Sequence, residues 1–237
     1  MSNVLVVGDV HGCFENLNII LKAHQNLDAA IVCGDYGIWN DFSPQNIPET
    51  YNIDYPCPVY FVDGNHENHA ALDTYERGKI HKIIGNLYFC AYGSVLNINN
   101  VKFLCCGGAD SIDKLHRKRN ISWWETECIS ESDQHFLPNE KIDIVISHTA
   151  PSEVCTQILE LPTNEWKGEK CSDPSLKYLD EVLERYAPHT WFFGHWHTKF
   201  HTKLNNTMFY GLDMVPICNS SYITKNSIQK CSKLLQI

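Results

Sequence analysis

Short apolar runs, each followed by a glycine or a polar motif, recur along the first part of the chain. Each run has the length of a buried strand, and the runs cover residues 4–7, 29–32 and 59–62. Between the first two runs, residues with helical spacing predict a helix that packs on the sheet, at Phe14, Leu17, Ile20, Leu21 and His24. The order of strand, helix, strand, polar loop and strand is typical of an open α/β sheet, which carries its sites beyond the carboxyl ends of the strands.

The middle of the chain has a different pattern. Three short strand-like runs are separated by Gly93 and Asn99-Asn100, and they cover residues 87–91, 94–98 and 101–106. They predict an antiparallel meander that contains a hairpin. Further strands are expected at residues 142–146, 191–193 and around 208–210.

The clearest amphipathic helix is expected from Ser175 to Tyr186, after the helix-start pair Asp173-Pro174. Residues 152–174 show little periodicity and predict a surface loop with one short helix. The polar stretch after residue 106 is too long for a turn, and we expect a lid or rim insertion around residues 107–137. No linker or repeat interrupts the pattern, so residues 1–237 are expected to form a single domain.

Composition narrows the class of protein. The chain has 237 residues, 43% of them hydrophobic and 20% charged, which is typical of a globular protein. The formal net charge of −9 argues against broad electrostatic binding to nucleic acid or to an anionic membrane. We see no secretory signal and no apolar run of membrane-spanning length, and therefore expect a cytoplasmic protein without a membrane partner.

The cysteines favour reduced thiols in a packed core. There are 11 of them, an odd number, and none forms a CxxC pair. Cys105 and Cys106 lie in a strand-like run, where adjacent side chains point to opposite faces. Small buried thiols account for this pattern better than a disulfide framework does.

Polar side chains that can bind metals follow the predicted strands. Gly194-His195-Trp196-His197 follows the aromatic run 191–193, and Asp9-Val10-His11 follows the run 4–7. Taken alone, a pair of histidines fits hydrogen-bonded core residues as well as ligands. The same kind of strand end recurs, however, and supplies further donors at Asp35, Asn65, His66 and His148.

This donor set fits metal-dependent hydrolysis. Imidazole and carboxylate suit zinc, iron or manganese, and one carboxylate can bridge two ions. Two ions about 3.5–4 Å apart would activate a bridging hydroxide and hold a phosphoryl group for in-line attack. The set contains no cysteine and no serine placed beside a base, so hydrolytic metal chemistry is favoured over covalent catalysis.

The ordered motifs resemble those of the calcineurin-like metallophosphoesterases. They are Gly8-Asp9-Val10-His11-Gly12, Gly34-Asp35, Gly64-Asn65-His66-Glu67, Ser147-His148 and Gly194-His195-Trp196-His197, and the resemblance spans roughly residues 4–213. It implies an α/β fold of four layers, a sandwich of two mixed sheets flanked by helices. It also implies two divalent or trivalent metal ions (manganese, iron or zinc) and a phosphate-ester substrate, with a nucleotide-like one among the possibilities.

The resemblance assigns roles by position. Asp9, His11 and His197 would hold one metal, Asn65, His148 and His195 the other, and Asp35 would bridge them. Asn65 and His66 would contact the substrate, and His66 would protonate the leaving oxygen. His66 and Asp35 are therefore the catalytic residues that the resemblance implies.

The second motif departs from the branch that includes serine/threonine protein phosphatases and diadenosine tetraphosphate hydrolases, which the first and third motifs resemble. Ile38 and Trp39 stand where that branch has an aspartate that orients the histidine and an arginine that holds phosphate. Asp41 or Glu67 is a candidate replacement for the aspartate. Protein phosphatase activity is put in doubt.

Residues 107–125 look like a stretch found in uncharacterised bacterial and phage-type members of the superfamily. There Arg117 and Arg119, with His116, are candidates for a replacement phosphate clamp, because the guanidinium fork donates two hydrogen bonds. The alternative is a solvated basic turn. Trp123 and Trp124 fit either a stacking surface for an aromatic leaving group or an anchor of this stretch to the core.

Three functions remain open at this stage. The first is a metal-dependent phosphomonoesterase or phosphodiesterase. The second is a nuclease or nucleic-acid end-processing enzyme, which the acidic charge does not favour. The third is a non-enzymatic protein-binding scaffold on the same fold. The sequence leaves the oligomeric state open.

Overall fold

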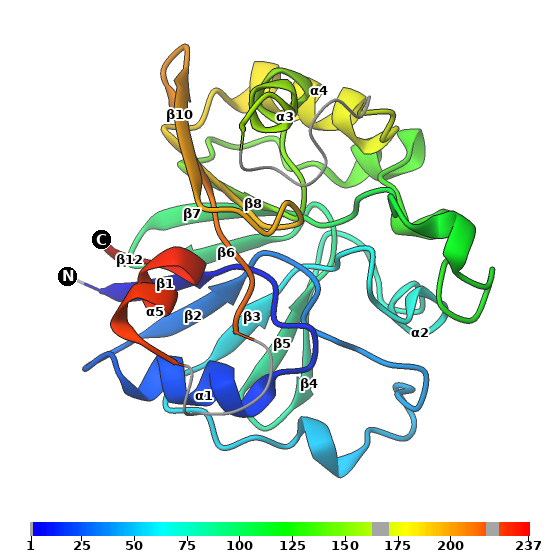
Figure 1. Ribbon diagram of the computed structural model, residues 1–237, viewed down its shortest axis with the longest axis vertical. Coiled ribbons are helices and arrows are strands. Elements are labelled where there is room, and N and C mark those ends of the chain that lie inside the picture. The colour runs from blue at the N-terminus through cyan, green and yellow to red at the C-terminus, as the bar shows by residue number, and fades with distance from the viewer. Residues whose placement is uncertain (1, 163–170, 217–222) are drawn as a thin grey trace.

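The computed structural model describes residues 2–162, 171–216 and 223–237. Two sheets lie face to face, with helices on the outer side of each (Figure 1). The predicted fold class, a four-layer α/β sandwich of two mixed sheets flanked by helices, is confirmed.

The first sheet has four parallel strands in its centre and an antiparallel strand at each edge. Its spatial order is β12 (Ser232–Gln236), β1 (Asn3–Val7), β2 (Ala29–Val32), β3 (Val59–Phe61), β5 (Leu87–Cys90) and β4 (Ile80–Ile84).

The second sheet repeats this arrangement, with four parallel central strands between antiparallel edges. Its order is β10 (Phe200–Leu204), β11 (Thr207–Gly211), β9 (Thr190–Phe193), β8 (Ile144–Ser147), β7 (Val101–Cys106) and β6 (Val95–Ile98).

Successive side chains along each strand point to opposite faces of its sheet, so each sheet contributes to the core on both of its faces. In β1, Val4 and Val6 point into the layer between the sheets, while Leu5 and Val7 belong to the core under the helices. Cys105 and Cys106 divide in the same way, as their strand-like run predicted. The buried cysteines of the described ranges are free thiols, which agrees with the expected reduced core; they are Cys33, Cys57, Cys90, Cys105, Cys106, Cys155 and Cys231.

The helices cover the two outer faces. The helix α1 (Phe14–Lys22) packs Leu17 and Ile20 against the first sheet. On the other side, α3 (Ser152–Leu159) and α4 (Ser175–Tyr186) pack against the second sheet (Figure 1). The shorter helices are α2 (His69–Leu72) and α5 (Lys225–Cys231) and the 3-10 turns η1 (Glu49–Tyr51), η2 (Lys114–His116), η3 (Glu125–Glu127) and η4 (Glu131–Phe136). In the described ranges, no helix is long and apolar enough to cross a membrane.

Two predictions about the chain's middle are wrong in part. The predicted meander is divided between the sheets, because β5 pairs with β3 and β4 in the first sheet, whereas β6 and β7 form the expected hairpin in the second. Local spacing does not tell to which sheet a short strand belongs. Within 152–174, the expected short helix is α3, but its Val154 and Ile158 are buried in the core rather than at the surface. Residues 163–170 of that stretch lie outside the described residues.

The segment 107–137 is fastened to the sandwich by buried groups. The side chain of Trp124 is 8% exposed, so this tryptophan serves as an anchor. The carboxylate of Glu127 is also buried, and its Oε1 accepts a hydrogen bond of 2.7 Å from the Ser111 backbone N–H. Glu127 thereby joins the end of η3 to the start of the segment.

Glu127 should make the stability depend on pH. Burial raises the pKa of its carboxyl group to about 7, so the folded protein retains a proton that the unfolded chain releases near pH 4.5. The stability that this proton contributes is present below pH 4.5 and is lost as the pH rises through 7. We expect Glu127→Gln to gain stability relative to the wild type between pH 5 and pH 8, by on the order of 3 kcal/mol at most.

Urea unfolding at both pH values measures this difference. The control is Glu125→Gln, since the Glu125 side chain is 63% exposed. A free-energy difference between Glu127→Gln and the wild type that does not change with pH would contradict the prediction.

Candidate metal centre

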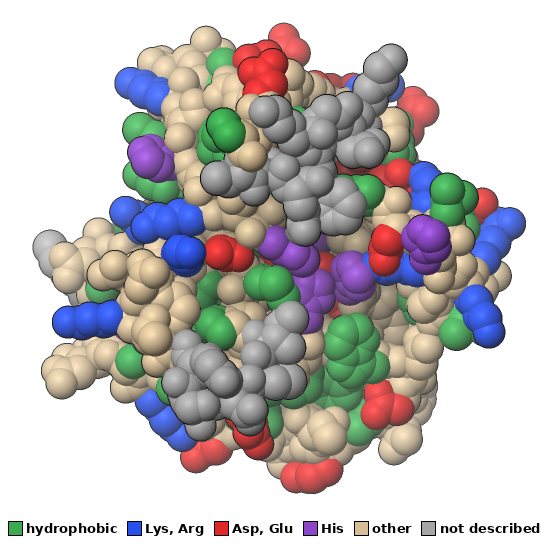
Figure 2. Space-filling view, in the orientation of Figure 1, with side chains coloured by type: hydrophobic (Ala, Val, Ile, Leu, Met, Phe, Trp, Pro, Cys, Tyr) green, Lys and Arg blue, Asp and Glu red, His purple; other side chains and the backbone are tan. Residues whose placement is uncertain are grey.

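The carboxyl ends of the central strands from both sheets meet at one edge of the sandwich. The first sheet brings there the loops after β1, β2 and β3, which are neighbours in its order. The second sheet brings the loops after β8 and β9. Histidine side chains gather at the centre of this face (Figure 2). All the predicted ligands lie on these five loops.

One group of donors joins the first and last loops. Asp9, His11 and His197 offer ligand atoms that all lie within 4.8 Å of one another. The Nε2 atoms of His11 and His197 are 3.1 Å apart, and the Nε2 of His197 is also 3.1 Å from Asp9 Oδ2. Side chains that are 186 residues apart in the sequence thus converge on one point.

A second group lies beside the first. Asn65 Oδ1 is 2.9 Å from His148 Nε2 and 3.0 Å from His195 Nδ1. Asp35 Oδ2 lies 3.5 Å from His148 Nε2 and 3.7 Å from His11 Nε2, and therefore stands between the two groups. Asp35 thus lies within reach of donors from both groups.

The backbone of these loops holds the side chains in an unusual conformation. The φ angles of His11, Asp35, His195 and His197 are +50°, +46°, +65° and +44°. Positive φ is uncommon outside glycine, and the surrounding structure must stabilise it. Four of the predicted ligands share this feature, which indicates a site whose geometry is imposed by the fold.

Two motif glycines provide the space into which the carboxylates fit. A Cβ atom on Gly194 would lie 1.9 Å from Asp9 Oδ1, and one on Gly64 would lie 2.1 Å from Asp35 Oδ1. Only glycine lets these backbones approach the carboxylates so closely. Each carboxylate also accepts a backbone hydrogen bond from the loop that packs on it, Asp9 from His195 N–H and Asp35 from His66 N–H.

The buried charges act strongly on one another. Burial alone would raise the pKa values of Asp9 and Asp35, but neighbouring histidines outweigh it, so both carboxyl pKa values lie below their usual range. Burial lowers the pKa of His148, yet the charge of Asp35 outweighs this effect and raises the pKa to about 10. Burial and the charge of His148 lower the pKa of His195 to about 3. Two buried carboxylates thus require positive charge between them.

The donor set fits metal ions. It consists of carboxylate, imidazole and amide oxygen, and several donor atoms converge without an apolar side chain between them. The Nδ1 of His148 is 2.8 Å from the carbonyl oxygen of Cys33, which directs its Nε2 toward the site. Such a hydrogen bond to the outer nitrogen is the usual support of a metal-binding histidine.

His66 is oriented by an arginine rather than by an acid. Arg117 Nη2 is 2.7 Å from His66 Nδ1 and also contacts Nε2. Glu67 does not replace the missing aspartate, because its buried carboxylate accepts hydrogen bonds from the backbone N–H groups of Gly37 and Ile38. Asp41 is exposed on the loop after β2. Of the two candidate replacements, Asp41 or Glu67, the second is thus engaged by backbone N–H groups, and His66 has Arg117 as its partner.

Three basic residues of the segment 107–137 are paired with carboxylates. Lys114 binds Asp110 at 2.6 Å, Arg117 binds Asp113 at 2.8 Å and Arg119 binds Glu125 at 2.7 Å. Arg117 is 8% exposed and reaches His66, whereas Arg119 is 61% exposed and points to Glu125. The structure thus brings Arg117 but not Arg119 to the donor groups.

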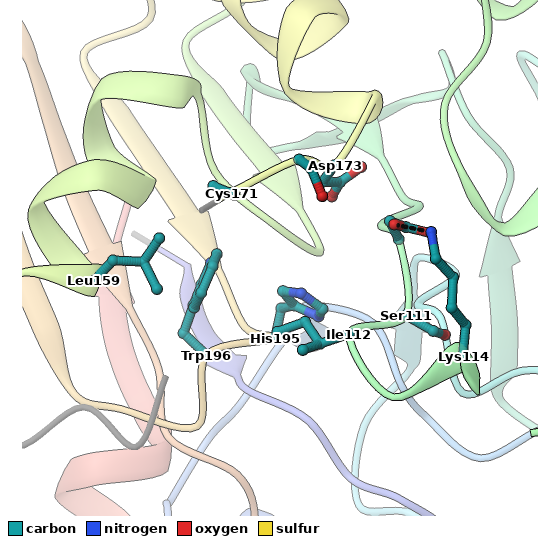
Figure 3. A pocket seen from close by; sticks show the side chains of 10 residues that line it. Ser111, Ile112, Lys114, Leu159, Cys171, Asp173, His195 and Trp196 are labelled. Atoms are coloured by element: carbon teal, nitrogen blue, oxygen red, sulfur yellow. Dashed lines mark hydrogen bonds and ion pairs between the residues drawn. The ribbon is translucent and has the colours of Figure 1, made fainter. Parts of the chain in front are cut away.

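Three cavities adjoin the donors. The one at the metal centre has a volume of about 120 Å³, and Asp35, Asn65, His66, His195 and His197 line it. A cavity of about 170 Å³ lies on the other side of His195, between Ile112, Trp196 and Asp173, where Lys114 is held by its ion pair (Figure 3). A larger one, of about 500 Å³, borders His66, Trp39 and Arg117.

Sequence reasoning missed two features of the site. Ser111 Oγ accepts a hydrogen bond of 3.2 Å from Asn65 Nδ2, which directs the amide oxygen of Asn65 toward the histidines. Trp39 borders the largest of these cavities, although the sequence showed it only as a departure from a known motif. The hydrogen bond and the cavity each involve segments that are far apart in the chain, so no local spacing revealed them.

Two curated relatives share the chain's sequence pattern. They are lariat debranching enzymes of Drosophila pseudoobscura pseudoobscura and Drosophila melanogaster. Each relative is 23% identical to this chain. Each alignment covers 83% of this chain and 43% of the relative. The chain thus spans less than half the length of the curated relatives it matches.

A solved structure shares the fold. It is the Plasmodium protein GAP50, described as the anchor in the inner membrane complex, with a TM-score of 0.50 and 12% identity. The alignment covers 89% of this chain and 70% of that one. At this identity the likeness concerns the fold alone.

The calcineurin-like phosphoesterase family matches residues 2–199, a range that contains all five strand-end motifs and both donor groups. The family pattern and the convergence of the donors therefore agree, and the chain belongs to the calcineurin-like phosphoesterases.

Proposed function

We propose that this protein hydrolyses phosphate esters with two metal ions, one held by Asp9, His11 and His197 and the other by Asn65, His148 and His195. Asp35 is the bridging ligand. The observation that carries the proposal is the position of Asp35 Oδ2, 3.7 Å from His11 Nε2 in one group and 3.5 Å from His148 Nε2 in the other. Two such ions supply Lewis acidity and activate water for attack on phosphorus.

The residues around the metal centre have complementary tasks in this proposal. Asn65 and His66 face the cavity in which the phosphoryl group would lie. Arg117 is the phosphate clamp, and its guanidinium offers several donors in a fixed fork. A bound phosphate would compete with His66 for Arg117. The freed ring nitrogen accepts from Arg117 beforehand and so carries no proton, and it would take one up from solvent before passing it to the leaving oxygen. Arg119, paired with Glu125 on the surface, has no part in the proposal.

Metal content and turnover should fall together when the bridging carboxylate is lost. We expect the purified protein to bind about two manganese, iron or zinc ions per chain and to cleave p-nitrophenyl phosphate or its bis ester. Asp35→Asn should lower the metal content and reduce turnover by at least about 100-fold, because it removes the charge shared by both ions. Elemental analysis and p-nitrophenolate release measure the two effects.

The conservative control is Asp28→Asn, a surface carboxylate that binds the Asn3 backbone N–H far from the centre. A chain that retains no metal under any loading condition would contradict the proposal and favour the protein-binding scaffold. Turnover by Asp35→Asn at the wild-type rate would contradict it equally.

Arg117 and Arg119 form a matched pair of variants. We expect Arg117→Ala to raise KM by at least about tenfold, because a charge-assisted hydrogen bond to phosphate is lost. Arg119→Ala should stay within about twofold of the wild type, since its partner is the exposed Glu125. Steady-state kinetics on one substrate measures both, and equal effects of the two substitutions would exclude Arg117 as a specific clamp.

Nucleic-acid phosphodiester hydrolysis is the second candidate. The two Drosophila relatives bear the name lariat debranching enzyme, and this name is what favours the candidate. The paired basic residues of the segment 107–137 and the formal net charge of −9 speak against a long electrostatic contact with a polynucleotide.

We therefore expect a single-stranded 20-mer to bind no more than a few-fold more tightly than a mononucleotide at 50 mM salt. Fluorescence anisotropy in competition format gives both affinities. An affinity for the 20-mer that is far higher and falls steeply with salt would instead indicate a polynucleotide substrate.

A further inference from the structure

The largest of the cavities that adjoin the metal centre opens directly beside His66. Its volume is about 500 Å³, within the range of ligand-binding pockets. His66 lines both this cavity and the one at the metal centre, so the two are neighbours across one imidazole ring. A phosphate ester held at the donors would extend its organic group toward this space. Hydrophobic side chains lie next to the histidines on this face (Figure 2).

Trp39 presents an exposed ring from a rigid loop. Its side chain is 42% exposed, whereas Tyr36 and Ile38 in the same loop are completely buried. The Trp39 backbone N–H donates to Tyr51 Oη at 2.8 Å, and its carbonyl oxygen accepts from Phe42 N–H at 3.0 Å. An aromatic ring this exposed, on a loop this well fixed, is not accounted for by core packing.

The position of the ring depends on glycines of the metal-site loops. A Cβ atom on Gly12 would lie 2.9 Å from Trp39 Nε1, and one on Gly37 would lie 3.1 Å from Trp39 Cζ2. The indole therefore rests on the backbone next to His11. This places a flat aromatic surface beside the donor groups, preorganised before any ligand binds.

Polar groups at the rim of the cavity match the edge of a heterocycle. The exposed Asn40 and Asp41 line it and offer an amide group and a carboxylate, whereas the amide of Asn68 is buried and donates to the Trp39 carbonyl oxygen. Asn40 Nδ2 also donates to the Ile121 carbonyl oxygen at 2.7 Å, which joins the Trp39 loop to the segment 107–137 across the opening. Amide and carboxylate groups are the side chains that read the amino and ring-nitrogen edges of bases.

We propose that the cavity beside Trp39 binds the base of a nucleoside phosphate, stacked on the indole, while the phosphoryl group lies at the metal donors. The inference deepens the proposed function and rests on it for the placement of the phosphoryl group. Stacking on tryptophan suits a planar heterocycle, because every base offers a π face. The exposed amide and carboxylate groups take the polar edge, and Arg117 lies between the base and the phosphate.

Binding of adenosine tests the subsite without any chemical step. Adenosine and ribose are titrated calorimetrically into the manganese-loaded protein, since the two differ only by the base. We expect adenosine to bind and ribose not to bind, and Trp39→Ala to weaken adenosine binding by about 10- to 100-fold. Trp39→Phe should retain most of the affinity. The control is Leu115→Ala, since Leu115 is 91% exposed and lines none of the three cavities.

Hydrolysis of adenosine 5′-phosphate and ribose 5-phosphate separates this inference from the proposed function. We expect Trp39→Ala to reduce kcat/KM for the nucleotide by about 10- to 100-fold and to leave that for ribose 5-phosphate within about twofold. If neither substrate is cleaved but adenosine binding depends on Trp39, the subsite is supported and the proposed hydrolysis is not. Equal losses for both substrates, or adenosine binding that Trp39→Ala does not change, would overturn the inference. Thermal unfolding of each variant identifies a loss that is due to misfolding. If Trp39→Ala is misfolded, the adenosine affinity of Trp39→Phe decides whether an aromatic ring at this position is what binds the base.

Discussion

The structure depends on keeping two carboxylates buried without solvent. Asp9 and Asp35 are 0% and 1% exposed at the junction of the two sheets. A buried carboxylate is costly unless positive charge and hydrogen-bond donors compensate it. The loops that meet there supply backbone N–H groups and imidazoles, and the low carboxyl pKa values show that this compensation exceeds the cost of burial. The two buried negative charges make the junction a place for cations.

Each loop at the junction makes room for the ligand of another loop. Gly194 admits Asp9, and Gly64 admits Asp35. The left-handed backbone of His11, Asp35 and His195 then turns the side chains toward the centre. Strain of this kind persists only where packing holds it, and here the strands β1, β2 and β9, buried except at Asn3 and Thr190, supply that packing. The geometry of the donors is thus a consequence of the sandwich as a whole.

The segment 107–137 gives the centre its chemical surroundings. Glu127 and Trp124 attach it to the sandwich, and Arg117 passes from it to His66. Its Lys114, Arg117 and Arg119 are each paired with a carboxylate of the same segment, so their positive charges are neutralised locally. In the function proposed above, a small, partly apolar substrate fits these surroundings better than an extended polyanion does.

The sequence by itself determined the alternation of the strands, the position of most elements and the five donor-bearing loops, because these follow from local periodicity and from strand ends. It did not determine that β5 and β6 belong to different sheets, that β12 closes the first sheet beside β1, or that Glu67 binds the backbone of the Trp39 loop. The cavity beside Trp39 and the contact of Arg117 with His66 were likewise hidden. Each of these features brings together residues that are far apart in the chain. Such contacts are decided by how the strands and the two sheets pack, and no local pattern encodes that packing.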